Sequence, residues 1–491
     1  MNRDDGKIEP RDSHMAEHGF ERAGADGSET AEPVLPAIDE EGTISRAFVE
    51  AVAAAIAAGD RARLRELAGD LHEADLGALV EALDAEDRPK LVELMGEDFD
   101  FLALTEVDGN IRDEILEELP ASTVAEGMRE LEADDAVVLI EDLDREDQQE
   151  ILEALPAVDR VALQRSLDYP ESSAGRLMQT TLVTAPPFWT AGQTIDHLRR
   201  AEEEELPDSF FEVFIVDPGH RLLGNVFLDV LLRAKGARPL EELMDRERRR
   251  VLVTEERGEV ARIFQHYNLV SLPVVDEAER LVGVITIDDI VDVIREEADE
   301  EMKALGGVSV TETLSDNVWW TTRSRFLWLF VNLVTAFIAS SVLGLFEGQL
   351  QKMVALAVLA PIVASQGGNA ATQTMTVVVR ALATRELSRF NRMRVIGREI
   401  FVGALNGAIF GVITGIGAAI WFGLTGLGVV IALAMLTNLV AGAIGGFLVP
   451  VVLDRGRVDP AVSSGAFVTT VTDVVGYASF LSIATIWFHL A

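Results

Sequence analysis

The last third of the chain contains long apolar runs without any charged side chain. Three of them are residues 326–346, 353–379 and 400–453, and the third is long enough for two crossings with a glycine-rich turn near Gly423. A further run surrounds Asp473, the only formally charged residue between positions 460 and 491. Because about 20 apolar residues suffice to cross a bilayer as a helix, the pattern predicts five transmembrane helices.

Basic residues lie almost entirely on one side of these predicted spans. Ten arginines occupy the three segments that share one side of the membrane, whereas the opposite loops contain only Lys352. Since Lys and Arg concentrate in cytoplasmic loops, this bias places the N-terminus in the cytosol and the C-terminus outside. We therefore expect a multi-pass protein of the cell (inner or plasma) membrane.

The two halves of the chain differ in charge. Residues 321–491 carry 11 Lys or Arg and six Asp or Glu, whereas residues 1–320 carry 31 and 76. The acidic half attracts cations, multivalent ones most, and argues against nucleic acid as a partner. A salt-adapted host or a GC-rich genome is the alternative explanation, because Arg far outnumbers Lys. The absence of cysteine excludes disulfides and thiolate metal sites.

Two features of the predicted spans indicate more than a membrane anchor. A carboxylate at membrane depth, such as Asp473, is costly unless it faces a partner, water or an ion. The second span, with the stretch PIVASQGGNAATQTMTVVV, adds amide and hydroxyl side chains that include Asn369. Polar groups at this depth normally face a bundle interior or a wet cavity, so a pore wall is predicted, with a polar helix–helix contact as the alternative.

The N-terminal part of the chain shows three patterns in succession. Residues 1–45 are polar and acidic and show no secretory signal, and we expect a disordered tail. Residues 46–168 contain short amphipathic helices with recurring Leu-Pro turns, which favours a small helical superhelix. Residues 179–300 contain a repeat with an offset of 59 residues, in which Asp217 and Gly224 recur as Asp276 and Gly283. This repeat resembles a tandem pair of CBS modules.

The segment 288–303 is densely acidic and leads into the first span. With about 3.6 residues per turn, Asp289, Asp292, Glu296 and Glu300 share one helix face. Like charges at this spacing weaken a helix unless a cation or the helix N-terminus offsets them. A cation bound to this helix is the functional interpretation, and a solvated face is the alternative.

Taken together, the sequence resembles the MgtE-type magnesium channels and transporters. The resemblance covers residues 46–491 and rests on four stretches: YPESSAGRLM (169–178), LVGVITIDDIVDVI (281–294), APIVASQGGNAATQTMTVVVRALATREL (360–387) and VDPAVSSGAFVTTVTDVVGYASF (458–480).

The resemblance implies a multidomain membrane protein with an all-α transmembrane domain of five spans, a cytosolic helical superhelix and an α/β tandem CBS pair. The expected divisions are a tail (1–45), an N-domain (46–168), the CBS pair (169–287), an acidic plug helix (288–321) and the pore domain (322–491). It also implies a homodimer in the lipid bilayer that admits Mg2+ under the membrane potential and is shut by cytosolic Mg2+.

By the same resemblance, particular residues are expected to contact the ion. Asp473 would be the ion-selecting carboxylate of the fifth span, completed by Thr469 and Gly465, where some relatives have Asn in place of this glycine. Asp459 would face the plug helix. The expected sensing acids are Asp289, Asp292, Glu297, Glu300, Glu301 and, in the N-domain, Asp134 and Asp135. Asn268 stands where some relatives have a sensing Asp. In some relatives the CBS pair binds ATP, which stays open for this chain.

Two other functions remain as alternatives. A proton- or Na+-coupled divalent cation carrier would also use an acid within a span, but the chain shows no inverted repeat and no second intramembrane acid is expected. A membrane-anchored divalent-ion sensor would leave Asp473 and the polar second span unexplained. An enzyme is not expected, because the chain has no phosphate-binding Gly loop with Lys, no HExxH and no GxSxG.

Overall fold

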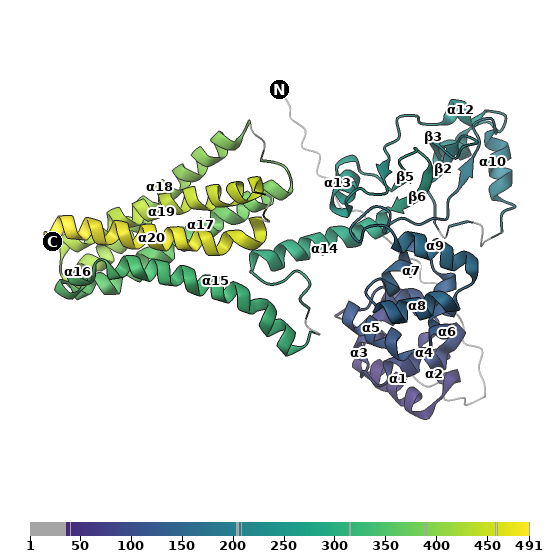
Figure 1. Ribbon diagram of the computed structural model, residues 1–491, viewed down its shortest axis with the longest axis horizontal. Helices are drawn as coiled ribbons and strands as arrows, with labels where there is room; N and C mark the ends of the chain where they lie inside the picture. Colours follow the sequence, from purple (N-terminus) through teal and green to yellow (C-terminus); the bar gives the residue numbers. More distant parts are fainter. Residues whose placement is uncertain are drawn as a thin grey trace, which may run out of the picture.

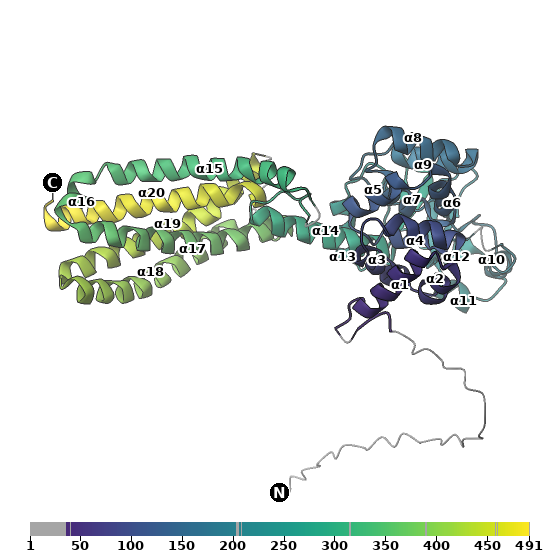
Figure 2. The ribbon, with the colours of Figure 1, turned by 90° about the horizontal axis from the view of Figure 1, so that it is seen from below.

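The computed structural model describes residues 36–39, 41–202, 206–207, 209–313, 316–387, 390–456, 458 and 460–490. An all-helical N-domain and an α/β body lie on one side, and a long helical bundle lies on the other (Figure 1). Helix α14 (Ile287–Leu305) runs from the α/β body to the bundle, and the view turned by 90° shows the same separation (Figure 2). Of the tail predicted for residues 1–45, positions 1–35 lie outside the described residues.

The N-domain is built from short helices around one apolar core. Leucines at helical spacing supply this core, and Leu64, Leu79 and Leu104 are completely buried. Helices this short are marginal in isolation, so burial of their apolar faces stabilises them. The elements are α1 (Arg46–Ala58), α2 (Arg61–Ala68), α3 (Glu73–Ala82), α4 (Arg88–Met95), η1 (Gly96–Asp98), η2 (Phe101–Leu104), α5 (Gly109–Glu118), α6 (Ala121–Gly127), η3 (Met128–Glu130), α7 (Ala133–Ile140), α8 (Arg145–Ala154) and α9 (Ala157–Leu167).

The α/β body contains the two copies of the predicted repeat. In each copy a short parallel strand precedes an antiparallel pair, which gives the strand orders β1-β2-β3 and β4-β5-β6. The first copy contains β1 (Thr184–Ala185), α10 (Ala191–Leu198), β2 (Glu212–Val216), β3 (Leu222–Phe227) and α11 (Leu228–Arg233). The second contains α12 (Leu240–Leu243), β4 (Val251–Leu252), α13 (Arg257–Tyr267), β5 (Ser271–Val275) and β6 (Leu281–Thr286).

The two copies meet through equivalent positions. The Leu222 N–H donates to the Glu279 carbonyl at 3.2 Å, and the Leu281 N–H donates to the His220 carbonyl at 2.9 Å. Each position in one bond is 59 residues from its counterpart in the other, so the copies are related by an approximate two-fold axis. This arrangement confirms the tandem pair that the repeat predicts.

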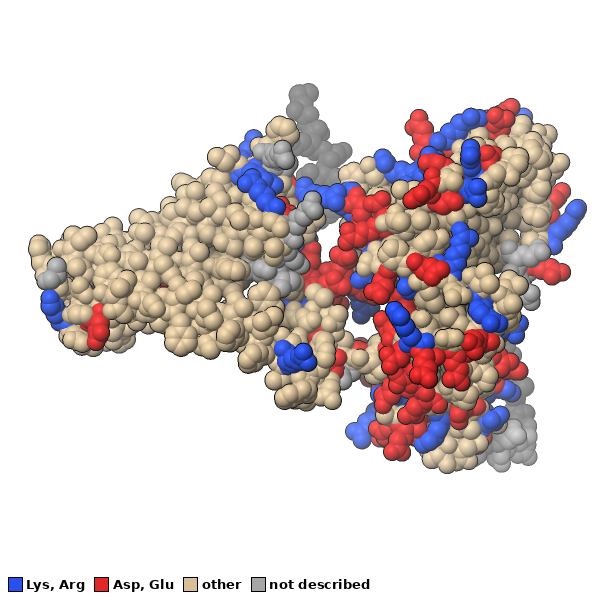
Figure 3. Space-filling model, viewed as in Figure 1, with Lys and Arg blue, Asp and Glu red and all other residues tan. Residues whose placement is uncertain are grey.

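The bundle contains five helices that are long and apolar enough to cross a membrane, counted over the described residues. The elements are α15 (Val318–Gly344), the short α16 (Glu347–Lys352), α17 (Val354–Ala383), α18 (Arg392–Phe422), α19 (Thr425–Arg455) and α20 (Pro460–Phe488). Helix α15 begins before the apolar run 326–346 that predicted it, because Asn317 caps the helix by accepting the Trp319 N–H at 3.0 Å. Acidic side chains cover the soluble half, while the bundle is almost bare of charge (Figure 3).

Four glycines of α18 are spaced four residues apart and bring this helix into close contact with α19. They are Gly403, Gly407, Gly411 and Gly415. A Cβ atom placed on Gly407 would lie 2.9 Å from Leu436 Cα, and one placed on Gly411 would lie 2.7 Å from the Ala432 carbonyl oxygen. Small residues at such a contact allow two backbones to approach. These glycines therefore pack the bundle, and their role is structural.

Candidate ion pathway and acidic clusters

Asp473 lies near the middle of α20 and is half-buried. Gly465, Thr469 and Asp473 follow at four-residue intervals and share one face of this helix. Thr469 is exposed, and its hydroxyl donates to the Gly465 carbonyl at 2.9 Å. Within the described part of the chain, no ion pair or hydrogen bond to the Asp473 carboxylate is found. The carboxylate thus lies on an accessible face without a protein countercharge.

Helix α17 has a polar face that the rest of the described chain leaves open. Its buried face is apolar and includes Val363, Ala371 and Val378. Its exposed polar side chains recur about once per turn and are Ser365, Asn369, Thr372, Gln373 and Thr376. A polar face at membrane depth requires a wet cavity or another polar surface against it.

The polar part of α17 and the acidic face of α20 lie at the same level of the bundle. A Cβ atom placed on Gly368 would lie 3.8 Å from the Thr472 hydroxyl, so the two helices are in contact there. Asn369 follows Gly368, and Asp473 follows Thr472. The structure therefore places two of the predicted pore residues on neighbouring helices at one height.

Asn438 on α19 is a buried polar residue at this level that the sequence analysis did not single out. Its side chain is completely buried, and Nδ2 donates to the Val363 carbonyl of α17 at 2.8 Å. It also packs on Gly476 of α20, where an added Cβ atom would lie 2.7 Å from Nδ2. Since Gly476 follows Asp473 by three residues, Asn438 joins the helices α17, α19 and α20 about one turn from the carboxylate.

Glu399 belongs to a membrane helix, but it lies near the N-terminal end of the 31-residue helix α18 and not at membrane depth. It lies within α18, is half-buried, and its Oε2 accepts the Thr374 hydroxyl of α17 at 3.2 Å. The apolar run used to predict this span begins at residue 400, so the acid was assigned to the preceding loop. In the structure it belongs to the helix, close to the end that faces the soluble half.

The C-terminal end of α14 packs directly on the two helices that carry the polar residues. Ala304 and Leu305 belong to one apolar cluster with Met375 of α17 and Val468 of α20. The chain then turns back, and the Lys303 ammonium donates to the Val310 carbonyl at 3.0 Å. A movement of α14 would therefore be transmitted to the ends of α17 and α20.

The N-terminal end of α14 faces acids of the N-domain. Asp289 caps the helix by accepting the Thr286 hydroxyl at 2.8 Å, and burial raises its pKa to about 7. Asp134 of α7 is buried, and its Oδ1 has no hydrogen-bond partner among the described residues. Burial, followed by the charges of Asp289 and Asp135, holds the pKa of Asp134 well above the usual range. Among the described residues, no ion pair joins a basic side chain to Asp134 or Asp289.

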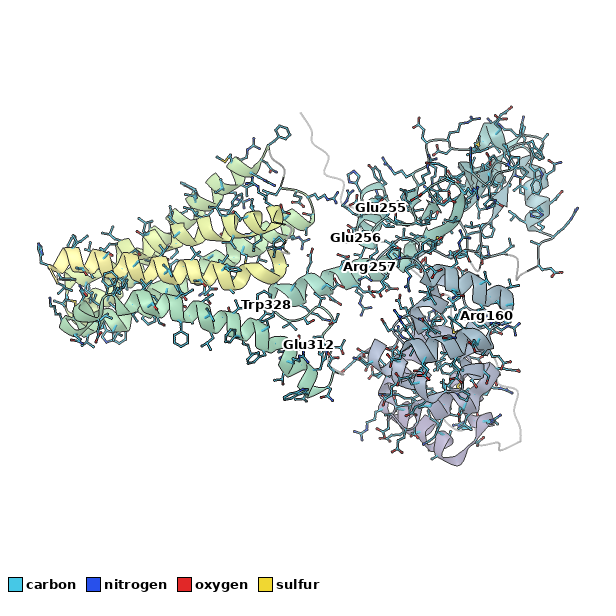
Figure 4. The ribbon with its side chains drawn as sticks, viewed as in Figure 1. Arg160, Glu255, Glu256, Arg257, Glu312 and Trp328 are labelled. Carbon is cyan, nitrogen blue, oxygen red and sulfur yellow. The ribbon has the colours of Figure 1, made fainter. Side chains whose placement is uncertain are left out.

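Farther along α14, an arginine provides the countercharge. Arg257, the first residue of α13, lies beside α14 (Figure 4). It contacts Glu296 at 3.0 Å and Glu300 at 3.2 Å. Glu297 lies between these acids along the helix, and its Oε1 would be 2.9 Å from a Cβ atom on Gly258. Burial, and next the charge of Glu300, raises the pKa of Glu297. The guanidinium thus occupies the middle of the acidic face.

Of the remaining predicted acids, Glu301 adds its charge, after burial and the charge of Glu300, to the raised pKa of Glu297. Asp292 and Glu301 are exposed on α14, and Asp459 lies outside the described residues. Among the residues that the structure describes, no three His, Cys, Asp or Glu side chains are arranged to hold a metal ion as a cage. The acids are arranged as opposed surfaces, which suits ions that keep most of their water.

Two further contacts connect the soluble half to the membrane half. The guanidinium of Arg385, after α17, lies 2.9 Å from the Glu259 carboxylate of α13. The amide of Asn110 in the N-domain donates to the Thr313 hydroxyl at 3.0 Å, just before α15. Neither contact is suggested by local sequence patterns.

Comparison with known proteins matches the three parts of this architecture. The family described as MgtE, divalent cation transporter, matches residues 360–483. The MgtE intracellular N domain matches residues 71–172, and the CBS domain matches residues 240–296. The magnesium transporter MgtE of Bacillus subtilis is 30% identical over 394 residues, which cover 79% of this chain and 86% of that protein.

The chain belongs to the MgtE family of magnesium transporters. The MgtE of Thermus thermophilus is 33% identical over 329 residues, covering 66% of this chain and 72% of that protein. A solved structure described as the cytosolic domain of the Mg2+ channel MgtE in complex with ATP shares 29% identity at a TM-score of 0.46, covering 50% of this chain and 99% of its own. The family matches and the five apolar helices describe a multi-pass membrane protein with an N-domain and a CBS pair.

Proposed function

We propose that this member of the MgtE family is a homodimeric channel that admits Mg2+ into the cell and closes when Mg2+ binds its cytosolic domains. One observation carries the proposal: the end of the acidic helix α14 packs on α17 and α20, the two helices that carry Asn369 and Asp473. The packing of α14 on α17 and α20 therefore connects the helix proposed to bind ions on the soluble side with the helices proposed to line the ion pathway.

The open polar face of α17 supports the homodimer. In one chain, Asn369 and the polar residues on its face are exposed at membrane depth, and lipid cannot satisfy them. A second copy placed against this face would enclose the polar residues and bring two Asp473 carboxylates toward a shared axis. The pore then lies between the subunits.

The chemistry of Mg2+ suits a pore with few charges. Mg2+ prefers six oxygen ligands and gives up its water reluctantly. Two carboxylates with hydroxyls such as that of Thr469 attract a hydrated ion without trapping it. A cage of four or more acids would bind the ion too tightly for rapid passage.

Closure follows from the acids on the soluble side. Asp134 and Asp289 oppose each other across the contact between the N-domain and α14, and no basic side chain among the described residues pairs with either. A divalent ion between these surfaces removes their repulsion and favours the compact arrangement. The ion shifts the equilibrium only by the difference in its affinity for the two arrangements. Farther along α14, Arg257 of α13 supplies a permanent countercharge to Glu296 and Glu300.

The direction of transport and the orientation rest on the charge pattern. The arginine bias places the soluble half in the cytosol, where the inside-negative potential drives a divalent cation inward. The acidic surface that binds Mg2+ then meets the ion that has already entered, which is the arrangement needed for feedback. ATP binding at the CBS pair stays a prediction.

The test uses purified protein in liposomes with a fluorescent Mg2+ indicator inside and an imposed inside-negative potential. We expect influx at low Mg2+ on the side of the soluble domains and little influx at high Mg2+. The variant Asp289→Asn/Asp292→Asn/Glu297→Gln removes carboxylates that would bind the ion, so its flux should no longer fall as Mg2+ rises. The matched control Glu50→Gln/Asp70→Asn/Glu86→Gln removes three exposed N-domain acids. Flux that requires a proton or Na+ gradient would indicate a carrier, and a triple variant that closes like the wild type would contradict the gating mechanism.

A further inference from the structure

The end of α18 nearest the soluble half carries an unusual group of exposed residues. Helix α18 has 31 residues and spans about 46 Å, whereas the hydrocarbon core of a bilayer is about 30 Å thick. Counting back from its C-terminal end at Phe422, the first ten or so residues therefore lie in the headgroup layer. Basic atoms gather at the upper end of the bundle nearest the soluble half, and most of the bundle surface between its two ends is uncharged (Figure 3).

Four side chains at this end surround a glycine on one exposed helix face. Gly397 is exposed, and an added Cβ atom would meet nothing within 4 Å. Met393, Arg394, Arg398 and Phe401 lie three or four residues from Gly397 or next to it, and all four are exposed. The bare backbone at Gly397 thus forms a notch with two guanidiniums beside it.

The opposite face of the same helix end is packed. Val395 and Ile396 join an apolar cluster with Phe447 and Val451 of α19. This packing fixes the rotation of α18, so the notch faces away from the bundle. Among the described residues, no carboxylate pairs with Arg394 or Arg398, although the chain as a whole carries a net charge of −40.

We propose that this notch, which we define as Met393, Arg394, Gly397, Arg398 and Phe401, binds the headgroup of an anionic phospholipid. Two guanidiniums about one helical turn apart can each donate paired hydrogen bonds to phosphate oxygens. Phe401, which is 69% exposed, lies one turn farther toward the hydrocarbon and can contact the acyl chains. Basic clusters at the membrane boundary attract anionic lipids. The inference is independent of the transport mechanism.

The experiment measures lipid retained by purified full-length protein. Wild-type protein in mixed micelles is titrated with phosphatidylglycerol or with phosphatidylcholine, and bound lipid is counted by native mass spectrometry. We expect a preference for phosphatidylglycerol that falls at least fivefold in Arg394→Gln/Arg398→Gln and in Gly397→Leu. The space around Gly397 is open, so the latter fills the notch without disturbing the bundle. Inorganic phosphate at millimolar concentration should not displace the lipid.

Two control variants match these changes. Arg61→Gln/Arg129→Gln removes two exposed arginines of the N-domain, and Gly417→Leu adds a side chain at an exposed, open glycine of the same helix. Both should keep the preference. Equal retention of the two lipids by the wild type, or an unchanged preference in both notch variants, would overturn the proposal. Displacement by inorganic phosphate would also overturn it, because the site would then bind free anions.

Discussion

Replacing Arg257 with glutamine removes the guanidinium that joins α13 to the acidic face of α14. Arg257 contacts Glu296 at 3.0 Å and Glu300 at 3.2 Å, and its side chain is 27% exposed. Exposed ion pairs are worth about 0.2–1 kcal/mol each, and the carboxylates of Glu296 and Glu300 are 57% and 40% exposed, so the two pairs together contribute about 0.4–2 kcal/mol to the compact arrangement. The variant would also leave Glu296, Glu297 and Glu300 to repel one another.

This energy converts into a shift of the Mg2+ response. A loss of about 1.4 kcal/mol changes the ratio of closed to open protein about tenfold. If closure takes up one Mg2+, the concentration that halves the flux should rise about tenfold, and if it takes up two, about threefold. Arg257→Lys should fall between the wild type and Arg257→Gln, because one ammonium cannot reproduce both contacts.

The assay is the liposome flux measured at graded Mg2+ on the side of the soluble domains. Arg233→Gln is the matched control, because it breaks an exposed contact to Asp229, 2.6 Å long, on the first CBS module. The double variant Arg257→Gln/Glu300→Gln should shift the Mg2+ midpoint by less than the sum of the shifts in the two single variants. A midpoint for Arg257→Gln that is unchanged or lower than that of the wild type would refute the role assigned to the arginine.

Three further predictions concern pH and packing. Because burial raises the pKa of Asp289 to about 7 and that of Asp134 well above its usual range, their protonation stabilises the contact between the N-domain and α14. This contribution to the stability of the contact is complete below the ordinary carboxyl pKa near 3.8 and is lost as the pH rises through about 7. Energy transfer between a dye on the N-domain and a dye on α14, measured in Mg2+-free buffer, should therefore fall over that range. The fall should be smaller in Asp134→Asn. Asn438→Ala should lower stability by about 2 kcal/mol, seen as a lower melting temperature, because it leaves a cavity and removes the hydrogen bond to the Val363 carbonyl. An unchanged melting temperature would contradict this. Gly411→Val should destabilise the bundle by about 2 kcal/mol or more, because even its Cβ atom would lie 2.7 Å from the Ala432 oxygen, while Gly417→Val has open space and should melt within a degree or two of the wild type.

Local sequence patterns predicted most of the architecture, because each pattern has a direct physical cause. Uncharged runs must cross the membrane as helices, and five such helices are present. The 59-residue repeat predicts two equivalent modules, and their bonds at Leu222 and Leu281 show this equivalence. The shared face of Asp289, Asp292, Glu296 and Glu300 follows from helical spacing alone.

Long-range partners could not be predicted in this way. Arg257 is separated from Glu300 by 43 residues, and Asn438 from Val363 by 75, so no local period connects them. Glu399 was missed because an apolar run does not show where a helix begins. Arg176 belongs to the stretch YPESSAGRLM, but only the structure shows that it contacts Glu141 at 3.0 Å and so ties the CBS pair to the N-domain.

The measurement that tests the central claim most directly is Mg2+ influx through Asp473→Asn, which removes the charge of the side chain and keeps its size. Wild type, Asp473→Asn and the control Asp454→Asn, an exposed acid beyond the pore level of α19, are compared in liposomes at low Mg2+ with an inside-negative potential. We predict that influx in Asp473→Asn falls at least tenfold or loses its selectivity for Mg2+, while the control transports like the wild type. Equal, selective influx in all three would contradict the assignment of Asp473 to the ion pathway.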